Sequence, residues 1–151
     1  MNPYIQLAIE EAKKGIQAGK GGPFGAVIVK DDQILSKACN EVLSSNDPTA
    51  HAEVLAIRRA SEKLQTFDLS GCVIYTTGEP CPMCLASIIW ANIKEVYFAA
   101  SAKEAAKIGF RDDLIYRHLR GEELILKVKE IQNEGILTLY QEYKKQNKLV
   151  Y

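Results

Sequence analysis

Two short motifs, each at the start of a predicted helix, constrain the fold of this chain more than any other feature. The first is His-Ala-Glu at residues 51–53, and the second is Pro-Cys-Pro-Met-Cys at residues 80–84. A helix N-terminus carries unpaired N–H groups and a partial positive charge, which favours ionised Cys81 and Cys84. Their spacing of three residues puts both sulfurs on one face, where a tetrahedral Zn²⁺ could bind them.

His51 is the expected third zinc ligand. A catalytic zinc site leaves its fourth position to water, so three protein ligands suffice. Two thiolates cancel the charge of the ion, so its water is less acidic than at a site of three histidines, and a nearby base is needed. Glu53 is the candidate for that base. Residues i and i+2 do not share a face of an ideal helix, so the pair can meet only through the geometry of the helix end.

Each motif alone has a simpler interpretation. An isolated Cys-x-x-Cys is often structural, and a helical His followed by Glu is more often a surface or capped pair. Their combination is the H-x-E and P-C-x-x-C signature of zinc deaminases. A structural zinc module without catalysis is the alternative, and it requires a fourth ligand from Cys39, Cys72 or His118. Otherwise we interpret these three as packing or surface residues.

Hydrophobic spacing predicts helices and strands in alternation along the chain. The expected helices cover residues 3–18, 48–64, 82–90 and 137–145, and the expected strands cover residues 24–29, 33–38, 72–76, 95–99 and 123–131, with a loop at 40–48. This alternation favours an α/β domain with helices on both faces of one sheet. The length of 151 residues favours one domain over residues 1–151.

Charge and hydropathy limit the partners that we expect. Nineteen basic residues balance nineteen acidic ones, which argues against binding to a nucleic-acid backbone. The N-terminus has no basic stretch followed by an apolar run, and no run of about eighteen apolar residues occurs. We therefore expect no membrane association and a cytoplasmic location.

With these motifs in view, the chain resembles the cytidine deaminase-like superfamily, and within it the bacterial guanine deaminases. The matching blocks are residues 21–26, 46–53 and 79–84, which taken alone also admit a tRNA adenosine deaminase. The Gly-Gly-Pro-Phe of residues 21–24, residues 109–116 and the end at Tyr151 resemble the guanine branch. Arg111 departs from the acidic residue expected beside Asp112. The resemblance implies a three-layer α/β/α fold with a five-stranded mixed sheet and one Zn²⁺ per subunit.

The resemblance also implies the residues that bind a purine. Asn40, Asp112 and Tyr151 would contact the base, together with Ala52, while Phe24 and Trp90 would form apolar pocket walls. Guanine presents N1–H and its amino group as adjacent donors for an ionised carboxylate, whereas adenine N1 is an acceptor. The alternatives are that Asn40 caps a turn, Asp112 caps a short helix and Trp90 belongs to the core.

The expected reaction is hydrolysis of guanine to xanthine and ammonia, with Glu53 taking a proton from a zinc-activated water. A tRNA adenosine deaminase is the alternative and needs a basic surface, but residues 141–151 hold only three lysines against one glutamate. The resemblance implies a homodimer in which the C-terminal segment is exchanged and covers the neighbouring site. The apolar end at residues 149–151 suits that role, and a frayed terminus is the other interpretation.

Overall fold

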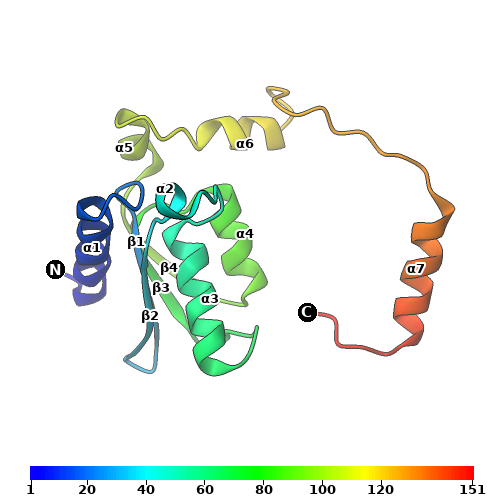
Figure 1. Ribbon diagram of the computed structural model, residues 1–151, viewed down its shortest axis with the longest axis horizontal. Helices are drawn as coiled ribbons and strands as arrows, with labels where there is room; N and C mark the ends of the chain where they lie inside the picture. Colours follow the sequence, from blue (N-terminus) through cyan, green and yellow to red (C-terminus); the bar gives the residue numbers. More distant parts are fainter.

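A computed structural model describes residues 1–151 as a four-stranded sheet with helices on both faces and a long C-terminal extension (Figure 1). The elements are α1 Pro3–Gln17, β1 Gly25–Lys30, β2 Gln33–Cys39, α2 Val42–Ser45, α3 Ala52–Leu64, β3 Val73–Gly78, α4 Pro82–Trp90, β4 Glu95–Ala100, α5 Ala102–Lys107, α6 Asp113–Leu119 and α7 Glu134–Lys145. The strand order is β2-β1-β3-β4. Strand β1 is antiparallel to β2 and β3, whereas β3 and β4 are parallel.

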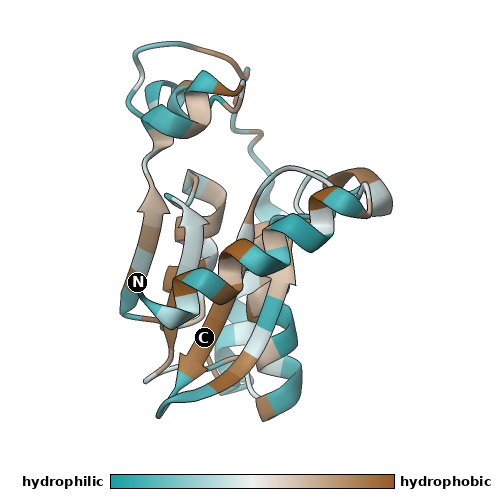
Figure 2. Cartoon of the chain, turned by 90° about the vertical axis from the view of Figure 1, so that its left-hand side faces the viewer, coloured by the Kyte–Doolittle hydropathy of each residue, from teal (hydrophilic) through white to brown (hydrophobic).

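Strand β1 contributes to two cores because helices cover both of its faces. Val27 and Val29 pack with Ala8 of α1 on one face. Ala26 and Ile28 belong to the larger core with α3 and α4 on the other face. A strand covered on both sides is a continuous apolar run, as the sequence of β1 is. Figure 2 shows α1 lying across the hydrophobic strands.

The expected strands at residues 24–29 and 33–38 are confirmed as β1 and β2, which pair as a hairpin through a tight turn. Asp31 and Asp32 both have positive φ, 48° and 60°. Two consecutive residues of this kind form the two-residue turn whose twist matches that of paired strands, and Asp tolerates the conformation. The expected helices 3–18, 82–90 and 137–145 are confirmed as α1, α4 and α7, within a few residues at their ends.

The helix expected from residue 48 begins later, at Ala52. The Asp47 side chain accepts hydrogen bonds from the Thr49 backbone N–H at 2.8 Å and from the Thr49 hydroxyl at 2.7 Å. This local turn competes with helix formation, and the chain turns at residues 48–49 before His51, whose own backbone is extended.

The chain has three further short helices, of which only α6 was considered from the sequence, as a short helix after Asp112. Helix α2 occupies part of the expected loop at 40–48, and α5 and α6 follow β4. With four to seven residues each, they are too short to show a helical repeat of apolar positions. No helix of the chain is both long enough and apolar enough to cross a bilayer.

The prediction of a fifth strand at residues 123–131 is wrong for this chain. The sheet has four strands, and residues 123–131 form no helix or strand and are exposed. Their apolar residues have nothing to pack against, because the segment leads away from the sheet to α7 (Figure 1). One edge of β4 consequently has no neighbouring strand.

We refer to residues 121–151 as the arm. Every residue of the arm is exposed, including its large apolar side chains. These are Leu124, Ile125, Leu126, Val128, Ile131, Ile136, Leu137, Leu139, Tyr140, Tyr143, Leu149, Val150 and Tyr151. Such an extent of apolar surface is characteristic of an interface.

Candidate metal centre and substrate pocket

The candidate site lies at the end of the sheet where β1 begins and where β2 and β3 finish. Phe24 precedes β1, Asn40 follows β2 and Glu79 follows β3. Because β1 is antiparallel to both of its neighbours, these three residues meet at the same end of the sheet and line one pocket. The residues that begin α3 and α4 reach the same pocket, as is common at the carboxyl ends of strands in α/β folds.

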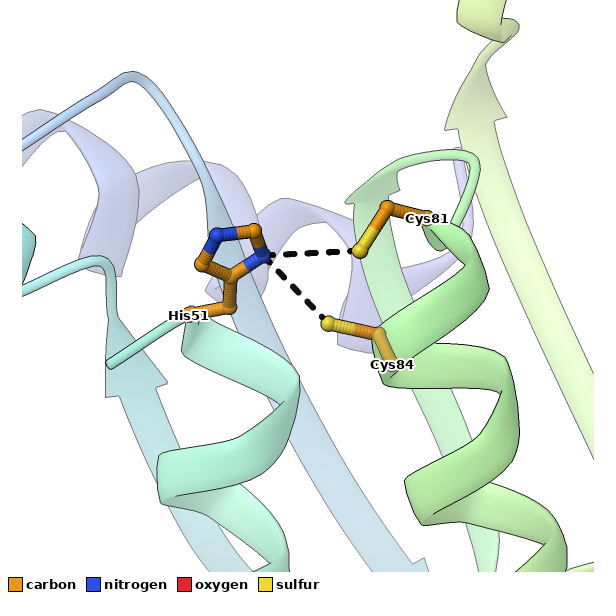
Figure 3. Close-up of side chains that lie close together, drawn as sticks. All are labelled: His51, Cys81 and Cys84. Atoms are coloured by element: carbon orange, nitrogen blue, oxygen red, sulfur yellow. Dashed lines mark hydrogen bonds between the residues drawn. The ribbon is translucent and has the colours of Figure 1, made fainter. Parts of the chain in front are cut away.

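The predicted ligands His51, Cys81 and Cys84 form one cluster (Figure 3). The Nδ1 atom of His51 lies 3.6 Å from Cys81 Sγ and 3.5 Å from Cys84 Sγ. A tetrahedral zinc with ordinary Zn–S and Zn–N bonds would set these separations at about 3.6 Å. The three side chains therefore fit a single zinc ion.

The backbone at the two helix starts explains how the ligands converge. His51 is the N-cap of α3 and Cys81 is the N-cap of α4, and both have extended backbone angles. Neither side chain caps its own helix, so both are free to bind a metal. His51 stands outside the helix and Glu53 in its first turn, so the two side chains line one pocket despite their i, i+2 spacing.

The protonation of the cluster favours a divalent cation. A hydrogen bond with Cys84 lowers the pKa of Cys81 to about 4, and a bond with His51 adds to this effect. The same bond with Cys81 raises the pKa of Cys84. The hydrogen bond with Cys81 also raises the pKa of His51. The cluster thus already stabilises one thiolate, and metal binding would release the remaining protons.

Glu53 is buried beside this cluster, with 8% of its surface exposed. Burial raises the pKa of its carboxyl group above the ordinary value. A carboxyl group whose pKa is raised in this way holds a proton more readily than an ordinary glutamate, so it can both accept a proton and return it. This is the property that a general base in hydrolysis needs.

The pocket has a volume of about 350 Å³, within the range of small-molecule sites. Its thirteen lining residues are Gly21, Gly22, Phe24, Asn40, Val42, Leu43, Pro48, His51, Glu53, Glu79, Cys81, Phe110 and Asp112. The structure therefore brings Phe24, Asn40 and Asp112 to the same cavity as His51, Cys81 and Glu53.

Asn40 has both of the roles considered from the sequence. Its Oδ1 accepts a hydrogen bond from the Val42 backbone N–H at 3.0 Å, so it does cap a turn. Only 5% of the residue is exposed, and it also lines the pocket. Because Oδ1 is engaged, the Nδ2 group is the part of the amide that remains to donate to a ligand.

Phe110 is a pocket residue that the sequence analysis did not single out. Its ring meets the edge of Phe24 in a T-shaped pair, with centroids 4.8 Å apart. A Cβ on Gly22 would lie 2.9 Å from Phe110 Cζ, so Gly22 makes room for the pair. In the sequence, the only sign that Phe110 lines the pocket was its position two residues before Asp112.

Asp112 precedes α6, but its side chain makes no capping hydrogen bond, which removes the helix-cap interpretation. Burial raises the pKa of this carboxyl, and the charge of Cys81 adds to the increase. Its acceptor atoms are therefore partly desolvated and available to a ligand.

Three residues predicted to contact the base or to form the pocket wall do not line this pocket. Ala52 is fully buried in the core. Trp90 is 66% exposed on α4, so it is not a core residue, and Tyr151 is 77% exposed. The rings of Trp90 and Tyr151 lie 6.2 Å apart, beside a second, open groove between α3 and α4. A contact of Tyr151 with a base within its own chain has no support in this arrangement.

The cluster does not include a fourth protein ligand. Cys39, Cys72 and His118, which a closed structural site would need, are not among the grouped potential ligands. His118 instead contacts the backbone of the arm, with its Nδ1 3.1 Å from the Ile125 N–H nitrogen. The three-ligand arrangement is that of a catalytic rather than a structural zinc site.

Comparison with known proteins agrees with this geometry. The cytidine and deoxycytidylate deaminase zinc-binding region matches residues 2–100. The guanine deaminase of Bacillus subtilis is 51% identical over 116 residues, which make up 77% of this chain and 74% of that protein. A tRNA-specific adenosine deaminase of Aquifex aeolicus is 45% identical over 101 residues, 67% of this chain and 66% of that one.

The fold extends the comparison beyond the matched sequence. The match to the X-ray structure of guanine deaminase from Bacillus subtilis covers 100% of this chain and 99% of that chain. It has a TM-score of 0.94 and 44% sequence identity. The match to a structure from a study of tRNA:A34 deaminases covers 66% of this chain and 71% of that chain. It has a TM-score of 0.63 and 38% sequence identity. The likeness over the arm is therefore found with the first of these structures.

Proposed function

Because the chain belongs to the cytidine and deoxycytidylate deaminase zinc-binding family, we propose that it hydrolyses guanine to xanthine and ammonia. The observation that carries this proposal is the convergence of Glu53, Asp112 and the zinc cluster on one cavity. The cluster and Glu53 account for hydrolysis, and Asp112 accounts for the choice of base.

The chain's own residues perform the proton transfers. Zinc, when held by His51, Cys81 and Cys84, would supply the positive charge that lowers the pKa of a water molecule, so that this water could lose a proton and attack a ring carbon. Glu53 takes a proton from the attacking water at C2 of guanine. It then delivers protons to the neighbouring ring nitrogen and to the amino group, which leaves as ammonia.

Recognition of guanine follows from the donors and acceptors at the pocket. An ionised Asp112 accepts from N1–H and the amino group, and it would repel the N1 acceptor of adenine. Asn40 offers its Nδ2 group to an acceptor on the opposite edge of the base. Phe24 and Phe110 supply the apolar contact that a flat ring needs.

A substrate panel tests the proposal. Purified protein is incubated with guanine, guanosine, adenine, cytosine and an aminotriazine, and ammonia is measured. We expect guanine to exceed adenine in kcat/KM by about 100-fold or more, because the wrong base leaves buried polar groups unpaired. Inosine formation in a tRNA, with no ammonia from guanine, would assign the chain to the adenosine deaminases instead.

We further infer that the arm is covered by a second copy of this chain. The arm is exposed throughout, and β4 has an open edge, so each copy has both an apolar segment and a place for one. Residues 123–131 of one copy would lie along β4 of the other. The partner is taken to be identical because the arm and the open β4 edge belong to the same chain, so a second copy supplies what each of them lacks.

In this arrangement Tyr151 would serve the neighbouring site rather than its own. The tip of the arm lies at the groove between α3 and α4, near Phe67 and Trp90. The exposed Ile89 and Trp90 of α4 extend this apolar surface toward a partner. A Tyr151 carried to the partner's pocket would close it over the base.

A further inference from the structure

One residue that lines the pocket, Glu79, makes two contacts that the proposed reaction does not use. Its backbone N–H donates to the carbonyl oxygen of Ala100, at 2.7 Å. Its side-chain Oε2 accepts from the backbone N–H of Ala102, at 2.8 Å. Glu79 therefore binds both the last residue of β4 and the first residue of α5.

The contact with Ala102 supplies a cap that α5 otherwise lacks. Ser101 occupies the N-cap position, but its side chain makes no hydrogen bond to the helix backbone and contacts the Glu104 side chain instead. A carboxylate from another segment satisfies the first N–H and favours the positive end of the helix.

Residues 102–112 have one polar contact with the body of the chain, beside the apolar pair of Phe110 with Phe24. The segment carries both Phe110 and Asp112 to the pocket. Its ion pairs, Lys107 with Glu104 and Arg111 with Asp113, stay within the segment or next to it. The bond from Ala102 to Glu79 is the only hydrogen bond or ion pair that joins residues 102–112 to residues 1–100.

We propose that Glu79 is a positioning residue that fixes residues 102–112, and with them Phe110 and Asp112, relative to the zinc cluster. Glu79 stands two residues before Cys81, so the loop that holds a zinc ligand also holds the segment that reads the base. This inference rests on the proposed function for its kinetic consequence, but the attachment of the segment can be tested without it.

Two pairs of variants separate positioning from charge. Glu79→Gln keeps an oxygen that can accept from the Ala102 N–H, whereas Glu79→Ala removes it. Ala102→Pro deletes the N–H itself at the first helical position, where proline is tolerated, and the extended backbone of Ser101 suits a following proline. Glu104→Ala is the matched control, because it alters the same helix end and leaves the Glu79 bond intact.

We expect loss of the Glu79 bond to raise KM and to leave kcat nearly unchanged. Glu79→Ala and Ala102→Pro raise the KM for guanine about tenfold, the equivalent of one lost charge-assisted hydrogen bond, with kcat within about threefold and zinc near one per chain. Glu79→Gln and Glu104→Ala stay within about threefold of the unmodified KM. If Glu79→Gln is as impaired as Glu79→Ala, charge rather than attachment is responsible and the proposal fails.

Limited proteolysis provides the independent measurement. Trypsin can cut after Lys103, Lys107 and Arg111, all within the segment. We expect Glu79→Ala and Ala102→Pro to be cut there several-fold faster than the unmodified chain, and Glu79→Gln to be cut at the unmodified rate. Equal rates in all variants would overturn the proposal. A chain inactive on guanine whose variants still differ in cleavage would refute the proposed function alone.

Discussion

Gly21 and Asn40 occupy adjoining space at the pocket, and a Cβ on Gly21 would lie 2.1 Å from Asn40 Oδ1. That oxygen cannot retreat easily, because it accepts the Val42 N–H and the residue is almost fully buried. The position of the Asn40 amide thus depends on the absence of a side chain at residue 21.

Gly21→Ala should raise the KM for guanine about tenfold or more, because overpacking displaces the Asn40 amide that we propose to face the base. Steady-state kinetics at saturating zinc measure the change. Gly19→Ala is the control: Gly19 has a φ of 65° and open space around it, so its replacement strains the backbone and should lower Tm with KM unchanged. Equal KM effects in the two variants would contradict the steric argument.

Glu53→Gln should lower kcat by about a thousandfold or more while zinc stays near one per chain. The amide cannot accept the proton of water, and Glu53 is not among the cluster of metal ligands. Metal analysis of the purified variant, together with ammonia release, checks both statements. Loss of zinc with residual activity would show that Glu53 helps to hold the metal and does not transfer the proton.

Guanine binding should weaken as the pH falls through the raised pKa of Asp112. Below that pKa the protonated carboxyl loses acceptor capacity toward guanine, and burial places the transition above the range of an ordinary aspartate. The Kd of guanine for Glu53→Gln, measured across acidic pH, isolates this effect from turnover. Adding Asp112→Asn should weaken binding about 100-fold and remove the Asp112 transition. A transition that persists unchanged in the double variant belongs to another group.

Exchange of the arm predicts complementation between two impaired chains. Tyr151→Ala and Glu53→Gln should each be impaired alone, but mixed dimers would combine an intact arm from one chain with an intact Glu53 from the other. Each mixed dimer formed on co-expression then has one complete site out of two, so we expect it to show about half of the activity of an unmodified dimer. Asp112→Asn with Glu53→Gln is the control, because both residues belong to one chain's pocket and no mixture has a complete site. Restoration in the control, or none in the first pair, would refute the exchange.

The centre of the site could be predicted because its chemistry is local. Cys81 and Cys84 lie three residues apart at a helix start, and His51 and Glu53 form an equally compact motif. What the motif could not show was that His51 would be an N-cap with an extended backbone, which is how it meets Glu53. The Asx turn at Asp47 decides that α3 begins at Ala52 rather than at residue 48.

The remaining features depend on contacts that a linear pattern does not record. Glu79 binds a backbone N–H 23 residues away, and such a partner leaves no side-chain signature. Residues 123–131 have the alternation of a strand but no neighbouring strand in their own chain, so their hydrophobic pattern indicated a strand that the isolated chain does not form. Phe110 packs on Phe24 from across the pocket.

The open edge of β4 also sets an order of events during synthesis. Residues 1–100 contain all four strands and both cores, so the sheet can assemble while the arm is still being translated. Until another chain arrives, the bare edge can accept any extended segment, including one from a misfolded copy. Losses to insoluble aggregates during rapid overproduction should therefore begin at β4, and slower translation should reduce them.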